Sequence, residues 1–295
     1  MLYNAAMCSG PMFILRLPKL LTIGWSQILF AKFSQVLEHH GPVTFDFGEV
    51  DWAAPFGLTA LSVVIEKCQA QGKDVFFTSP RNELFSSYLN RIAFRPLFQK
   101  RDGIKPTKTS MELTRLIGVD PGCSENLVEL ISTNFPLTED AKYEMRTHLN
   151  ELMTNAFDHS KTKLGFFVCA QWYPVKRNLR ISFADGGIGI FQSLKNSGGF
   201  PGVKNDLEAI RLAVKPGITT RKNQLGGFGL AYIRKYVRNN NGTLTIISGH
   251  GKVNFYRNKT ENKFEPIKFD GTIVDILISP QKGSGLKEDD KHDLF

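Results

Sequence analysis

The chain has 295 residues, of which 42% are hydrophobic and 22% charged, a globular composition with room for one large or two medium-sized domains. Its net charge of +9 favours an anionic partner such as a nucleotide, a nucleic acid, an acidic protein or an anionic membrane, although a basic soluble surface is the simpler explanation. The four cysteines lack metal-pair spacing, which argues against a zinc site and a disulfide framework. The only early apolar stretch is too short for a signal or membrane segment, so we expect a cytoplasmic protein.

The first hundred residues alternate between the apolar periods of strands and helices. The predicted strands are residues 12–17, 43–47 and 75–77, and the predicted helices are residues 26–37, 57–71 and 82–90. Gly72 is placed to end the second of these helices. The alternation predicts a small α/β domain over residues 1–98.

The next segment is basic and weakly periodic. Residues 91–120 contain seven basic and three acidic side chains, and we predict a connecting linker over residues 99–120. A second domain is predicted over residues 121–280, with a charged, disordered tail over residues 281–295. Its predicted helices are residues 138–157, 206–214 and 230–237, and its predicted strands are residues 164–172, 178–184, 243–247, 253–256 and 272–278.

Four polar side chains share one face of the helix predicted over residues 138–157. They are Glu144, His148, Glu151 and Asn155, spaced by four, three and four residues. By itself, such a stripe indicates a solvated helix face more often than a site.

Two glycine-rich segments make a site the better interpretation. Residues 185–190, Asp-Gly-Gly-Ile-Gly-Ile, directly follow a predicted strand, and residues 226–230, Gly-Gly-Phe-Gly-Leu, directly precede a predicted helix. Glycines at such places let the backbone approach a ligand closely and present N–H groups to phosphates, and a helix N-terminus adds its positive dipole end.

In this order, the three motifs resemble those of the ATPase superfamily shared by gyrase, MutL, histidine kinases and anti-sigma-factor serine kinases. Residues 151–159 are similar to its asparagine motif, Asp185–Gly189 to its Asp-x-Gly-x-Gly motif, and Gly227–Leu230 to its Gly-x-Gly-Leu motif. Thr272 follows Gly271 where the family has Gly-Thr before its last core strand. The resemblance implies an α+β two-layer sandwich, in which a mixed sheet is covered on one face by helices and ATP lies beneath a lid formed here by residues 190–226.

The resemblance also implies a role for each matching residue. Asn155 would be a ligand of the Mg²⁺ ion that bridges the phosphates of ATP, and Glu151, one turn earlier, would be the general base. Asp185 would accept a hydrogen bond from the adenine amino group, with Thr272 behind the base. Gly187 and Gly189 would pass close to the base, whereas Gly227, Gly229 and Leu230 would line the phosphates. Arg221 and Lys222 are weaker candidates for phosphate contacts.

The first domain resembles the STAS fold of anti-sigma-factor antagonists. The similar segments are Val43–Phe47, Val50–Trp52 and Phe56–Leu58. In that family a Ser or Thr before the Gly-Leu pair is phosphorylated, but here Phe56 occupies the position. The resemblance therefore implies a binding or packing scaffold, and a generic α/β domain is the alternative.

Together these observations predict a Mg-ATP-dependent regulatory protein that controls a protein partner. A serine/threonine kinase of anti-sigma type, an ATPase switch and a non-catalytic ATP-binding module all remain open. A DNA-acting ATPase of gyrase or MutL type ranks below them, because no transducer domain follows in the sequence. We expect neither a nucleic-acid nor a membrane partner, and a homodimer is left open.

Overall fold

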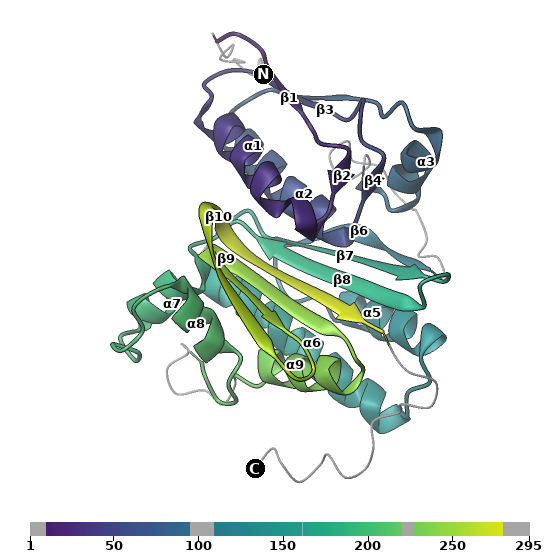
Figure 1. Ribbon diagram of the computed structural model, residues 1–295, viewed down its shortest axis with the longest axis vertical. Coiled ribbons are helices and arrows are strands. Elements are labelled where there is room, and N and C mark those ends of the chain that lie inside the picture. The colour runs from purple at the N-terminus through teal and green to yellow at the C-terminus, as the bar shows by residue number, and fades with distance from the viewer. Residues whose placement is uncertain (1–9, 95–108, 161, 220–226, 280–295) are drawn as a thin grey trace, which may run out of the picture.

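The computed structural model describes residues 10–94, 109–160, 162–219 and 227–279. It is a mixed α/β structure built around two sheets of very different size, joined by helices that lie between them (Figure 1). Arg221, Lys222 and the predicted tail after residue 280 lie outside the described residues.

The N-terminal region, residues 10–94, contains a small parallel sheet with strand order β1-β3-β5. Its strands are β1 (Phe13–Arg16), β3 (Val43–Asp46) and β5 (Val75–Thr78), and a separate parallel pair is formed by β2 (Leu20–Leu21) and β4 (Trp52–Ala53). Its helices are the 3-10 turn η1 (Ile23–Trp25), α1 (Ser26–Glu38), α2 (Pro55–Ala70) and α3 (Glu83–Arg91). The strand–helix alternation predicted for this region is confirmed.

The C-terminal region, residues 109–279, contains a five-stranded sheet with strand order β6-β7-β8-β10-β9. Its strands are β6 (Ser110–Leu116), β7 (Phe166–Tyr173), β8 (Asn178–Asp185), β9 (Thr243–Phe255) and β10 (Thr260–Ile278). Its helices are α5 (Pro121–Asn134), α6 (Glu139–Ser160), α7 (Gly189–Ser197), α8 (Asp206–Ala213) and α9 (Gly229–Asn239).

Local signals in the sequence explain where several helices begin and end. The Thr138 hydroxyl accepts a hydrogen bond from the Ala141 amide at 3.2 Å, so α6 begins at a side-chain cap followed by two acidic residues. The Asn82 side chain caps α3 in the same way, through the Phe85 amide at 3.1 Å. Gly72 follows α2 with a φ of 77°, the left-handed conformation that favours glycine after a helix.

Two features of the large sheet differ from the expectation. Every pairing in the described sheet is antiparallel, so the expected mixed sheet is wrong, because short hairpins join β7 to β8 and β9 to β10. Helices also cover both faces: α5, α6 and α9 lie on one face and α1 and α2 on the other (Figure 1). The second difference is an added layer from the N-terminal region, since the C-terminal region's own helices lie on one face of its sheet, as the two-layer sandwich requires.

Several elements were not predicted, among them β2, β4 and η1 of the N-terminal region. Strand β6 lies in the segment predicted as a linker and forms the edge of the large sheet, and helix α5 follows it. Helix α7 lies in the segment expected to be a lid, and the two strands predicted over residues 243–256 form one strand, β9.

Two hydrophobic cores lie on the two faces of the large sheet. Successive residues of β7 alternate between them, since Phe167 and Cys169 belong to the core shared with the N-terminal region, whereas Phe166 and Val168 belong to the core beneath α6 and α9. The N-terminal region thus supplies one of the two layers that bury the sheet. No helix within the described ranges has the length and apolarity needed to cross a membrane.

Candidate functional site

A cavity opens between helices α6, α7 and α9 and the ends of strands β8 and β10. Its empty space, counted together with the open solvent at its mouth, is about 830 Å³. Its lining is mainly apolar and consists of Leu152, Asn155, Ala156, Phe183, Ala184, Asp185, Gly189, Ile190, Ser193, Leu194, Ala213, Ile218, Thr219, Leu230, Thr272 and Val274. Five of the predicted site residues, from four separate stretches of chain, are in this list.

Among the described residues, Asp185, the last residue of β8, is the only carboxylate that lines this cavity, and only 6% of its surface is exposed. One carboxylate oxygen accepts a hydrogen bond from the Gly187 amide at 2.8 Å. Burial raises the pKa of Asp185 to about 7, although the amides of Gly187 and Thr272 and the ammonium group of Lys67 oppose this rise. A buried acceptor in an apolar cavity suits a ligand that donates a hydrogen bond.

The backbone next to Asp185 is held by close packing that only glycine allows. Gly271 has a φ of 139°, and a Cβ atom there would lie 1.9 Å from the carbonyl oxygen of Asp185. The buried Ser248 hydroxyl accepts a hydrogen bond from the Ile190 amide at 2.8 Å and contacts the Gly271 carbonyl oxygen at 3.2 Å. Ser248 therefore ties the start of α7 to β10.

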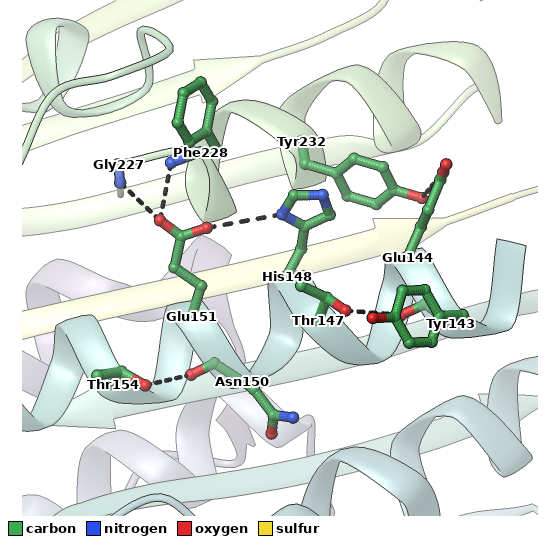
Figure 2. A network of polar contacts seen from close by, with 10 residues as sticks. All are labelled: Tyr143, Glu144, Thr147, His148, Asn150, Glu151, Thr154, Gly227, Phe228 and Tyr232. Carbon is green, nitrogen blue, oxygen red and sulfur yellow. Dashed lines mark hydrogen bonds and ion pairs between the residues drawn. The ribbon is translucent and has the colours of Figure 1, made fainter. Parts of the chain in front are cut away.

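Glu151 points toward the loop that leads into α9 (Figure 2). Its Oε1 accepts hydrogen bonds from the amides of Gly227 at 2.6 Å and Phe228 at 2.8 Å. Partial burial alone would raise the pKa of Glu151, but the neighbouring His148 and these two amides lower it below its ordinary value. The carboxylate occupies a pair of N–H groups at a helix start, which is a typical anion-binding arrangement.

The polar face of α6 is directed at α9 and is not merely solvated. The His148 ring stacks on Tyr232 with centroids 3.9 Å apart, and the Tyr232 hydroxyl donates to Glu144 at 3.4 Å (Figure 2). His148 Nδ1 lies 3.6 Å from Glu151 Oε2, which is an ion-pair distance when the ring is protonated and too long for a hydrogen bond.

Comparison with known proteins adds no family or relative here. No protein-family model matches the chain, and no curated protein matches it.

The nine predicted site residues divide into two groups. Asn155, Asp185, Gly189, Leu230 and Thr272 line the cavity. The others, Glu151, Gly187, Gly227 and Gly229, are not among the residues that line it but lie beside it.

The two glycines before α9 permit close packing. Gly227 has a φ of 85°, and a Cβ atom there would lie 2.3 Å from the Ile218 carbonyl oxygen. A Cβ atom on Gly229 would lie 3.2 Å from the His148 carbonyl oxygen, so α9 begins directly against α6. These glycines place the amides of residues 227 and 228 within reach of the Glu151 carboxylate.

Sequence reasoning gave no role to Ser248 or Tyr232. Each acts through a contact far away in sequence, so no spacing rule indicates it. Phe228 lies within the predicted Gly-x-Gly-Leu motif, but the bond of its amide to Glu151 was not predicted. In the part of the chain that the structure describes, no group of three His, Cys, Asp or Glu side chains could hold a metal ion. Asn155 alone is compatible with Mg²⁺ held mostly by phosphate and water oxygens.

Proposed function

We propose that the protein binds Mg-ATP in the cavity between α6, α7, α9 and the large sheet. The supporting observation is that Asn155, Asp185 and Thr272, taken from three distant motifs, line one cavity. Had the motif matches arisen by chance, there would be no reason for them to meet.

The Asp185 end of the cavity suits the adenine base. The apolar side chains of Leu152, Phe183 and Val274 offer surfaces for a flat ring, and the Asp185 carboxylate would accept its amino proton. Thr272 pairs with Asp185 across the strands and borders the same space.

The α9 end suits the phosphates. The amides of Gly227 and Phe228 already bind one anionic group, the Glu151 carboxylate, which supports an affinity for anions at this helix start. Asn155 would supply an oxygen ligand to Mg²⁺, and bound Mg²⁺ would neutralise phosphate charge.

The proposed activity is that of a regulatory ATP-dependent protein, either a serine/threonine kinase of anti-sigma type or an ATPase switch that controls a protein partner. In this function Glu151 is the general base, which requires its carboxylate to leave the two amides, because those bonds lower its basicity. A non-catalytic ATP-binding module is the second candidate, and the hydrogen bonds of Glu151 to the α9 loop favour it. The N-terminal region would be a STAS-like scaffold.

Purified protein incubated with ATP labelled at the γ-phosphate tests the proposal. Released phosphate indicates an ATPase, label on a co-purified or added protein indicates a kinase, and binding without either indicates a module. Failure to bind ATP by calorimetry, with and without Mg²⁺, would overturn the nucleotide site itself.

A further inference from the structure

Lys67 lies in the N-terminal region, yet it packs against the loop of residues 186–188 that follows Asp185, called here the Asp185 loop. It belongs to the last turn of α2, which packs against β7 and β8 of the large sheet. The Lys67 Nζ donates a hydrogen bond to the Asp270 carbonyl oxygen at 2.7 Å. Asp270 is the residue before Gly271, whose backbone closes against Asp185.

The Lys67 stem also packs on the residue after Asp185. A Cβ atom on Gly186 would lie 2.7 Å from Lys67 Cε and 2.9 Å from a methyl carbon of Val63, another α2 residue. Only a glycine lets α2 approach this closely. Helix α2 is also fixed to β8 at Ser182, three residues before Asp185, where the buried hydroxyls of Thr59 and Ser182 lie 2.9 Å apart.

The charges around this loop come from four elements. A second, more polar cavity behind the loop is lined by Lys67 of α2, Lys268 and Asp270 of β10, Asp206 of α8 and His250 of β9. Lys268 is paired with the Asp270 carboxylate at 2.8 Å, and an Asp206 oxygen accepts from the His250 amide at 3.0 Å. Among the described groups, Lys67 is the one whose charge acts on Asp185.

We propose that Lys67 is a positioning residue of the nucleotide site, through which the N-terminal region holds the Asp185 loop and keeps the Asp185 carboxylate available as a hydrogen-bond acceptor. The role of Lys67 in nucleotide binding rests on the proposed ATP site, whereas its effect on the Asp185 carboxylate does not depend on that site. It gives α2 a second role besides packing, since any displacement of α2 moves a positive charge relative to the base-binding carboxylate.

The direct test is the titration of the Asp185 carboxyl carbon by NMR in the nucleotide-free protein. Lys67→Met keeps the stem and removes the charge, so the Asp185 midpoint should rise by about one pH unit. Lys67→Arg, which keeps the charge, should leave the midpoint near that of the wild type. If Lys67→Met does not fold, Lys67→Gln provides the same comparison.

A matched control is Lys73→Met. Lys73 is a buried lysine of the N-terminal region, whereas Lys67 is half-buried, and the Lys73 Nζ donates to the carbonyl oxygens of Val36 and Leu37, away from the loop. It should leave the Asp185 midpoint unchanged. An unchanged midpoint in Lys67→Met, or an equal rise in Lys73→Met, would overturn the role of Lys67.

Adenosine binding then separates this inference from the proposed function. In Lys67→Met the affinity should fall roughly fivefold at pH 7 and recover at alkaline pH, where Asp185 is ionised in both proteins. Wild-type protein that binds no adenosine or ATP would refute the proposed site, while the NMR midpoints would still decide whether the charge of Lys67 acts on Asp185. A loss of affinity that is equal at every pH would refute the charge role.

Discussion

Replacing Asp185 with Asn should weaken nucleotide binding and, at neutral pH, stabilise the nucleotide-free protein. The carboxylate is almost fully buried, and burial raises its pKa from an ordinary 3.8 to about 7. Ionisation of Asp185 therefore lowers the free energy of unfolding. An asparagine of the same shape cannot ionise, and its side-chain oxygen can still accept the Gly187 amide that now bonds Asp185.

The size and sign of the effect follow from this pKa difference. The folded protein holds the Asp185 proton to a higher pH than the unfolded chain does. The free energy of unfolding consequently falls as pH rises from about 4 to about 7, and stays lower above that range. At 1.36 kcal/mol per pKa unit the cost reaches on the order of 4 kcal/mol. This figure is already net of the hydrogen bonds from the Gly187 and Thr272 amides, because they oppose the rise in the pKa of Asp185.

Urea unfolding of both proteins across this pH range measures the effect. The stability advantage of Asp185→Asn should be small near pH 4 and greatest above about pH 7. In calorimetry, the variant should bind ATP more weakly by about 1.5–3 kcal/mol, the worth of a hydrogen bond to a charged group. A stability difference that does not change with pH would refute the raised pKa. Equal ATP affinity would remove Asp185 from the base site.

Two further predictions concern the site, and a third concerns helix α2. Asn155→Ala should abolish Mg²⁺-dependent ATP binding while circular dichroism shows an intact fold, and wild-type binding that ignores EDTA would contradict the Mg²⁺ role. Glu151→Gln should bind ATP as tightly as the wild type but turn over roughly 10²–10⁴-fold more slowly in single-turnover assays, whereas unchanged turnover would exclude it as base. Phe56 has no hydroxyl to accept a phosphate, and Thr59 and Ser62 are fully buried in α2. Intact-mass spectrometry after incubation with ATP should therefore find no phosphate on this helix, and a phosphorylated Thr59 or Ser62 would revive a STAS-like switch.

Much of the fold could be predicted because the relevant signals are local. The caps at Asn82 and Thr138 and the glycine at position 72 mark helix ends through bonds a few residues long. Helix α5 had such a signal too, since Asp120 accepts from the Gly122 amide and Pro121 follows it directly, but the basic character of the segment obscured it. Strand β6 had no comparable mark, because its pairing with β7 joins residues far apart in sequence.

The residues of the candidate site could be predicted from the sequence, but their long-range contacts could not. Asn155, Asp185 and Thr272 belong to short motifs that the sequence displays openly, and the structure brings them to one cavity. The partners of Glu151 are backbone amides 76 and 77 residues away, and the contact of Lys67 with Asp270 spans 203 residues. Residue types and spacing contain no information about such contacts.

Helix α2 has consequences for how the chain folds during synthesis. Nearly all of its residues are buried, one side against the small parallel sheet and the other against β7 and β8, and the Thr59–Ser182 contact spans 123 residues. At 5–20 residues per second, a ribosome takes roughly 6–25 s to extend the chain from one partner to the other. During that time an apolar helix face remains uncovered, within reach of chaperones or of neighbouring nascent chains. The N-terminal region is thus made first but completes its core last.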